Sequence, residues 1–69
     1  MVAVFKTNVP DKSEADKLVE ILSMHFPACR INFDLDDCDK VLRIEGKTVE
    51  VSTVTTLVLE KGVFCEALE

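Results

Sequence analysis

An alternation of apolar and polar residues between positions 29 and 35 is the feature that most limits how this 69-residue chain folds. Its apolar members are Cys29, Ile31, Phe33 and Leu35, and its polar members are Arg30, Asn32 and Asp34. Because successive side chains of a strand point to opposite faces, the pattern predicts a strand that is buried on one face only. An acidic turn, residues 36–39, and a returning strand, Val41–Glu45, follow it, and Gly46 closes the second strand.

A helix is predicted ahead of these strands. Asp11 suits the N-cap, and Glu14, three residues later, completes a capping box. Ser13 with Asp16 offers a second register for the same box. An apolar stripe at helical spacing follows, formed by Ala15, Leu18, Val19, Leu22 and Phe26. Pro27 then ends the helix.

Residues 47–59 carry the patterns of both a strand and a helix. Their β-branched residues favour a strand, and some of them alternate. Ser52 as an N-cap, and Gly62 as a C′ glycine after Lys61, favour a helix instead. We predict a short helix over about residues 53–61. The two remaining strands are predicted at residues 2–8 and Val63–Leu68.

The order β-α-β-β-α-β predicts an α+β, ferredoxin-like sandwich with a four-stranded antiparallel sheet, in strand order 4-1-3-2, and both helices on one face. The chain length predicts a single domain, residues 1–69, with no room for a second core. Leu68-Glu69 could be the remnant of a cloning tag, although Leu68 also suits the last strand. In this topology the loop before the first helix, the 36–39 turn and the loop before the last strand all lie at one end.

The composition restricts the partners. Thirteen acidic residues against 8 basic ones make a net charge of −5, which repels phosphate backbones and anionic membranes, so we expect neither nucleic acid nor membrane as a partner. The start, MVAVFKTN, does not predict a signal peptide. The 3 cysteines are odd in number and form no CxxC, which fits a reduced cytoplasmic setting. Cys29 and Cys65 are expected to be buried, and Cys38 to be exposed in the acidic turn.

Framework positions along nearly the whole chain carry a family resemblance. They are Leu18 and Leu22, Phe26-Pro27, "INFDLDD", "VLRIEG" ending in Gly46, and "LEKG" before the last strand. On these positions the chain resembles the heavy-metal-associated domain of copper chaperones and copper-transporting P-type ATPases. The resemblance implies the fold described above.

The functional motif of that family, Met-x-Cys-x-x-Cys, does not carry over. Its methionine falls on Val9 and its two cysteines on Asp11 and Glu14, while Lys61 falls near a lysine that offsets charge at the metal thiolates in some chaperones. Cu(I) prefers soft thiolates, whereas carboxylates offer hard oxygen ligands. The departure therefore predicts that tight Cu(I) binding is lost.

Asp11 and Glu14 have two interpretations. In the favoured one they cap the helix and place negative charge at the positive end of its dipole. In the other they form, with Asn8, a weak site for a hard divalent cation, and Cys38 and Lys61 lie at the same end. We predict the cap, with no catalytic residue and no cofactor. The segment "DLDDCDK" lacks the glycine and the distal glutamate of an EF-hand loop, and His25 is expected to cap the helix end.

The expected function is a non-enzymatic domain that binds another protein, or a second copy of itself, through an edge strand or the loop end. The alternative is the binding or transfer of a metal ion through an acidic or mixed-ligand site where the first strand meets the first helix. An acylphosphatase-type enzyme would need a glycine-rich anion loop with an arginine there, and RNA recognition would need aromatic residues on the sheet. The sequence lacks both features.

Overall fold

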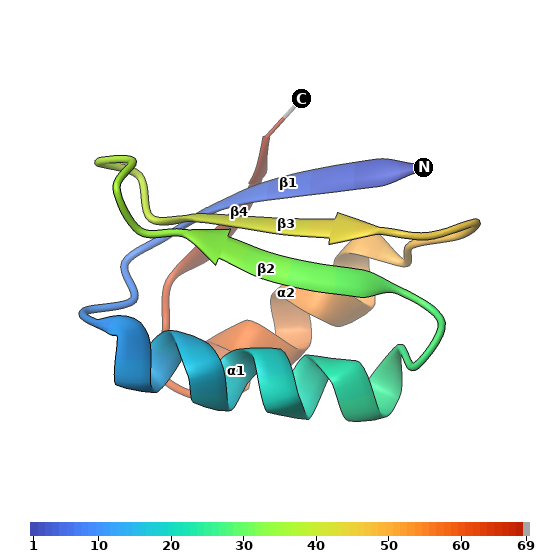
Figure 1. Cartoon of the computed structure of the whole chain (residues 1–69), viewed down its shortest axis with the longest axis horizontal. Coiled ribbons are helices and arrows are strands. Elements are labelled where there is room, and N and C mark those ends of the chain that lie inside the picture. Colours follow the sequence, from blue (N-terminus) through green and yellow to red (C-terminus); the bar gives the residue numbers. More distant parts are fainter. Residues whose placement is uncertain (69) are drawn as a thin grey trace.

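The computed structural model describes residues 1–68, which form two helices and four strands (Figure 1). The elements in chain order are β1 (Val2–Thr7), α1 (Lys12–His25), β2 (Arg30–Asp34), β3 (Val41–Glu45), α2 (Val51–Glu60) and β4 (Cys65–Leu68). The strands form one antiparallel sheet in the order β2-β3-β1-β4, which is 4-1-3-2 when it is read from the β4 edge. Both helices cover the same face of this sheet (Figure 1). The predicted α+β architecture is confirmed, and it is compatible with a ferredoxin-like fold.

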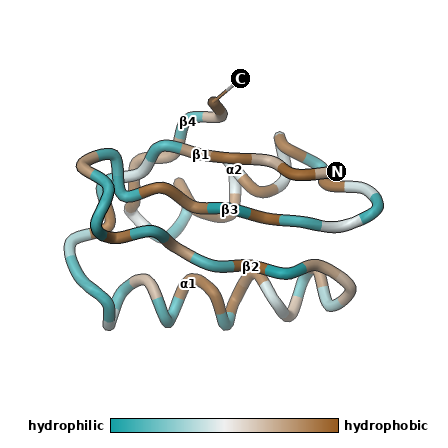
Figure 2. Tube along the Cα trace, turned by 45° about the horizontal axis from the view of Figure 1, so that its top comes forward, coloured by the Kyte–Doolittle hydropathy of each residue, from teal (hydrophilic) through white to brown (hydrophobic). Residues whose placement is uncertain are grey.

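One face of the sheet is buried because its apolar side chains meet the two helices. Phe5 of β1, Leu42 and Ile44 of β3, Leu22 of α1 and Val54 of α2 are fully buried. Hydrophobic segments follow the central strands β1 and β3 and the turns of α1 in Figure 2. The buried face therefore joins both helices to the two central strands in one core.

The alternation that opened the sequence analysis is confirmed in β2. Ile31 and Phe33 are half-buried and pack against the core, whereas Arg30, Asn32 and Asp34 are exposed on the other face. The strand is shorter by one residue at each end than predicted, because Cys29 and Leu35 already belong to the connections. The last strand begins at Cys65 rather than at residue 63. Leu68 ends β4, and Glu69, the second residue of the suggested tag remnant, lies outside the described residues.

α1 begins as the sequence predicts, with half of the capping box. Asp11 is the N-cap, and its Oδ1 accepts a hydrogen bond from the backbone N–H of Glu14 at 3.0 Å. The Glu14 carboxylate turns to Lys17, with Oε1 3.4 Å from Nζ, and within residues 1–68 it does not return a bond to Asp11. His25 occupies the last turn, where its Nδ1 lies 3.2 Å from the carbonyl oxygen of Ile21. The reciprocal bond of the capping box was therefore predicted wrongly, while the caps at Asp11 and His25 are confirmed.

α2 begins earlier than predicted. Its N-cap is Glu50, which makes no side-chain cap bond, and Ser52 lies exposed inside the first turn. The physical reason is packing, since Val51 contacts the core and Val54 is fully buried, and burial of an apolar face outweighs the preference for a capping side chain. The end of the helix is confirmed, because Gly62 has a φ of 79° and donates its N–H to the carbonyl of Leu59 at 3.0 Å.

Gly46 fulfils a packing role at the end of β3. A Cβ atom at this position would lie 2.6 Å from the Sγ of Cys29, so any side chain would displace the thiol. The backbone of Gly46 also exchanges hydrogen bonds with Met1, at 2.8 and 3.0 Å, which holds the start of β1 against β3. Cys29 is half-buried and not fully buried as predicted, whereas Cys65 is buried and Cys38 exposed as predicted.

Candidate functional site

The connections that the topology predicts at one end are tied together by the end of β1. The backbone N–H of Thr7 donates to the carbonyl of Asp39 at 3.0 Å, and the Thr7 hydroxyl donates to the carbonyl of Lys40. On the other side, Oδ1 of Asn8 accepts from the backbone N–H of Phe64 at 2.8 Å. The 36–39 turn and the loop between α2 and β4 are therefore both anchored to the segment that leads into α1.

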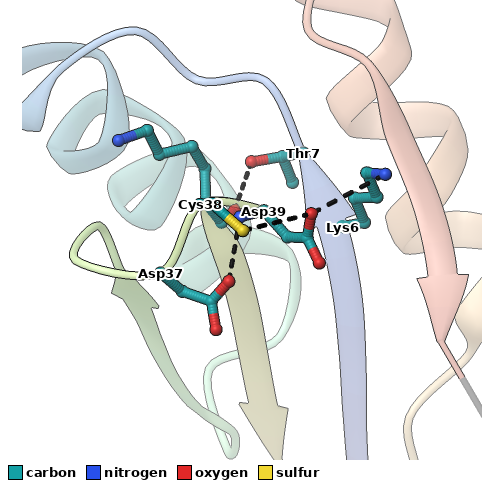
Figure 3. Close-up of polar contacts among 6 residues, drawn as sticks. Lys6, Thr7, Asp37, Cys38 and Asp39 are labelled. Atoms are coloured by element: carbon teal, nitrogen blue, oxygen red, sulfur yellow. Dashed lines mark hydrogen bonds and ion pairs between the residues drawn. The ribbon is translucent and has the colours of Figure 1, made fainter.

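The 36–39 turn gathers acidic groups (Figure 3). Oδ1 of Asp37 accepts from the backbone N–H of Asp39 at 2.9 Å, and Sγ of Cys38 lies 3.9 Å from Oδ1 of Asp39. Nζ of Lys6, on β1, is 3.7 Å from the same Asp39 oxygen. One ligand atom each of Asp37, Cys38 and Asp39 lies within 4.8 Å of the others. In the part of the chain that the structure describes, this is the one group of three such side chains close enough to share an ion.

Three of the residues that the sequence offered as metal candidates bond to other groups of the protein instead. Asp11 caps α1, Glu14 contacts Lys17, and Asn8 holds the loop before β4. Lys61 is exposed at the C-cap of α2. Among the described residues, Lys61 pairs with neither of the two carboxylates.

Sequence reasoning weighed the segment "DLDDCDK" as an EF-hand loop and named Cys38 from it as a metal candidate, but it did not name Asp37 or Asp39 individually. Their signal was the run Asp36-Asp37-Cys38-Asp39 itself. Its compact geometry depends on the turn, in which Lys40 takes a positive φ of 45° and donates its backbone N–H to the carbonyl of Asp37 at 3.0 Å. Lys40 also donates its Nζ to the carbonyl of Leu35, at 3.1 Å.

A second site is the free edge of the sheet at β2. Within residues 1–68 the backbone of β2 pairs on one side only, with β3. A groove of about 350 Å³ lies between this edge and α1, and we call it the β2 edge groove. Its apolar wall is formed by Ala15, Phe33 and Leu35, and its charged rim includes Lys12, Asp16 and Asp34. An unpaired strand edge beside half-buried apolar side chains is the kind of surface that another strand pairs with.

The uncovered face of the sheet is electrically balanced. It bears three basic and three acidic residues, which are Lys6, Arg30 and Arg43 against Asp34, Glu45 and Glu66. Apolar Val4 lies between Arg43 of β3 and Leu68 of β4 in the strand register. A hollow of about 380 Å³ on this face is lined by residues that include Val4, Asn32 and Arg43.

Cys65 is the buried cysteine of the described chain, and its environment disfavours the thiolate form. Burial raises the pKa of the Cys65 thiol, and a hydrogen bond with Thr55 lowers it by less. Since the thiolate and not the thiol is the nucleophile, a buried cysteine with a raised pKa is a packing residue. Cys65 therefore adds no catalytic chemistry to the site.

Compared with protein-family models, with curated proteins and with solved structures, the chain matches none. The resemblance to the heavy-metal-associated family therefore stays a prediction from the residues named above. In residues 1–68, neither helix has both the length and the apolar character needed to cross a bilayer.

Proposed function

We propose that this chain is a non-enzymatic protein-interaction domain of the reduced cytoplasm, built like a heavy-metal-associated domain that has lost its Cu(I)-binding cysteines. A ferredoxin-like fold is part of the proposal, and the four-stranded antiparallel sheet with two helices on one face supports it. The observation that carries the function is the free edge of β2 beside the β2 edge groove.

The edge supports binding because its backbone donors and acceptors already point outward in strand geometry. A second strand that pairs there satisfies both sets of groups without rearranging the sheet, so little conformational entropy is lost. Half-buried Ile31 and Phe33 add apolar surface on the helix side of the edge. Asp11 and Glu14 support the proposed loss of Cu(I) binding, since both have carboxylate oxygens where Cu(I) prefers thiolates. Asp11 also accepts the N-cap hydrogen bond of α1.

Position-specific cross-linking in cells tests the interaction. A photo-reactive amino acid at Asn32, exposed on β2, is expected to form discrete adducts with a protein partner. The matched control is the same group at Ser23, exposed on α1. Equal adducts from both positions, or none from Asn32, would contradict an interaction surface at this edge.

Competition against a chromophoric Cu(I) chelator tests the lost metal site. The monomer is expected not to compete, because no thiol pair lies in one loop among residues 1–68. One-to-one Cu(I) binding at about the sub-picomolar level would reverse this part of the proposal.

The second candidate function is metal-ion binding or transfer at the acidic loop end, and one observation favours it. A thiol and two carboxylates, from Cys38, Asp37 and Asp39, lie close enough to share an ion. These residues are not the ones at the positions of the family's cysteines, and Lys6 already lies beside Asp39. The interaction domain is therefore the stronger proposal.

A further inference from the structure

We infer that the partner at the β2 edge is a second copy of this chain, whose own β2 pairs antiparallel with the first in a register centred on Asn32. The inference rests on the proposed function and names its partner. In such a pair the two sheets continue into one another across a twofold axis, and each copy offers the same strand to the other.

The sequence of β2 is self-complementary in this register. The strand reads Arg30-Ile31-Asn32-Phe33-Asp34. With Asn32 on the axis, Arg30 of each copy lies opposite Asp34 of the other, so that two pairs of opposite charge form. Ile31 of each copy lies opposite Phe33 of the other, so that two apolar pairs form. Asn32 meets itself, and a side-chain amide can both donate and accept a hydrogen bond.

In this register the charged pairs and the apolar pairs lie on opposite faces of the strand. Arg30, Asn32 and Asp34 are exposed on the uncovered face, where water surrounds a charged pair. Ile31 and Phe33 are half-buried on the helix side and pack against the core. Directly opposed cross-strand pairs of opposite charge, and pairs of an aromatic with a β-branched residue, both stabilise antiparallel strands. Every exposed or half-buried side chain of β2 thus meets a suitable partner.

Neighbouring registers lose this match. A shift by two residues in one direction places Arg30 opposite Asn32 and leaves Asp34 opposite Ala28, outside the strand. A shift by one residue pairs apolar with polar side chains and turns the second sheet over, because side chains alternate between faces. A shift by two residues in the other direction places Arg30 opposite Asp36, which lies in the turn after β2, and Asp34 opposite Asn32. Centring on Asn32 is therefore the register that gives each charged residue of β2 an opposite charge inside the strand.

The other edge of the sheet, at β4, is less suited to pairing with a second copy. β4 has 4 residues, Cys-Glu-Ala-Leu, against the 5 of β2. Pairing β4 with itself places Glu66 opposite Glu66 or opposite an apolar residue, with no opposite charge in the strand to meet it. The β2 edge also has the groove beside it, whose apolar wall of Ala15, Phe33 and Leu35 is left open by the monomer.

The net charge of −5 on each copy opposes association, but it acts over a longer range than the pairs at the edge. Salt screens that repulsion, since the Debye length is about 8 Å at physiological ionic strength. The strand itself is neutral, because Arg30 balances Asp34. Repulsion between whole molecules therefore weakens the pair without changing its register.

Charge exchange tests the register. Arg30→Asp alone and Asp34→Arg alone each replace two attractive pairs by two repulsive ones, so each variant is expected to dissociate at least about tenfold more readily than the parent. An equimolar mixture of the two variants restores both attractive pairs and is expected to recover the dimer. The double variant, Arg30→Asp with Asp34→Arg, is expected to recover it as well. Sedimentation equilibrium gives the masses, and circular dichroism confirms that each variant is folded.

Cross-linking at the axis gives an independent readout. In a Cys38→Ser background, Asn32→Cys places two thiols opposite one another, at a Cα separation of roughly 4.5–5.5 Å that a disulfide spans. Mild oxidation is expected to link this variant and to leave Arg30→Cys unlinked, because residue 30 faces residue 34. Equal linking of the two variants would overturn the register.

The outcomes separate this inference from the proposed function. A parent that stays monomeric throughout the micromolar range, together with adducts to a different protein from Asn32, overturns the second copy as partner and leaves the interaction function standing. A monomer without adducts overturns both. A dimer whose dissociation is the same in both single-charge variants and in their mixture places the contact elsewhere and overturns the inference.

Discussion

At the residue scale, Asp11 and Glu14 stabilise the start of α1 in different ways, Asp11 as the N-cap and Glu14 as the acidic residue of the first turn. Asp11 supplies a hydrogen-bond acceptor to a backbone N–H that the helix itself leaves unpaired. Glu14 supplies charge near the positive end of the helix dipole and an exposed ion pair with Lys17. A directed bond to an unpaired N–H is worth more than an exposed pair, so the two residues should differ in their effect on stability.

Replacing Asp11 with Ala is expected to lower the free energy of unfolding by about 0.5–2 kcal/mol, because the Glu14 N–H loses its acceptor. Glu14→Ala is expected to lower it by only about 0.3 kcal/mol, the scale of an exposed pair on a helix. Asp11→Asn is the matched control, since it keeps an oxygen acceptor and removes the charge. Urea denaturation measures all three. If Asp11→Ala and Glu14→Ala unfold like the parent, the cap does not hold the start of α1.

The buried thiol of Cys65 is expected to make the stability of the protein depend on pH in the alkaline range. Burial raises the pKa of its thiol in the folded protein, so the folded state holds the proton more tightly than the unfolded state does. Below the ordinary pKa of a thiol, roughly 8.5, both states are protonated and the group does not change stability with pH. Above it the unfolded chain loses its proton first, so the free energy of unfolding falls as pH rises.

Cys65→Val, which fills a similar volume without an ionisable group, is expected to remove this part of the alkaline decline. Cys38→Ser is the control, because Cys38 is exposed. Urea denaturation between about pH 7 and 10 measures the slope for each variant. An identical slope in Cys65→Val and the parent would show that the thiol does not contribute to it.

At the scale of elements, α2 shows what apolar packing does to a helix start. Glu50 has an extended backbone, with φ of −84° and ψ of 96°, which suits an N-cap, but its side chain makes no cap bond. Its Oε1 instead accepts from the hydroxyl of Thr53 at 3.1 Å. The helix is therefore held at this end by burial of its apolar face, and the first N–H groups lack a side-chain acceptor among the described residues.

Glu50→Asp is expected to stabilise the protein by about 0.5–1 kcal/mol, because the shorter carboxylate reaches the backbone N–H groups of the first turn from an N-cap. Glu50→Gln is the control, as it keeps the length and removes the charge. Thermal unfolding of the three proteins measures the difference. A lower melting temperature for Glu50→Asp would show that the bond to Thr53 matters more than a new cap.

A comparison of β2 with α2 shows which parts of the structure could be predicted from the sequence and which could not. A period of two in β2, with an acidic turn after it, depends on neighbouring residues alone, and the strand pair was predicted closely. The start of α2 depends on Val51 reaching a core built by distant residues, so the local signal of Ser52 was misleading. The hydrogen bond between Asn8 and Phe64 joins residues 56 positions apart, so no pattern among neighbouring residues predicts it. The topology brought the candidate residues to one end, but their hydrogen bonds decide which polar atoms are left for a ligand.

At the scale of the whole molecule, negative charge is concentrated at the loop end while the uncovered sheet face is balanced. Three of the 13 acidic residues, Asp36, Asp37 and Asp39, lie in the 36–39 turn, and Asp34 at the end of β2 directly precedes them. Two of these carboxylates already accept backbone N–H bonds, Asp34 from Asp36 and Asp37 from Asp39. The concentration of charge attracts cations of any kind, whereas a metal site also requires free ligand atoms at fixed positions.

A titration with calcium, magnesium, manganese and zinc separates these two cases. If the loop end is a solvated acidic surface, amide resonances of Asp11, Glu14 and residues 36–39 shift weakly and independently. If it is a site, one ion shifts them together with a shared saturation, and stability rises by about 2.7 kcal/mol at a hundredfold excess over Kd. We expect the weak and independent result, because Asp11 and Asp37 serve backbone amides and Lys6 lies beside Asp39. Cys38→Ser is the matched variant: a solvated surface is indifferent to it, whereas a mixed-ligand zinc site loses its thiolate. Concerted saturation below about 10 µM, abolished by Cys38→Ser, would make metal binding the function of this end of the molecule.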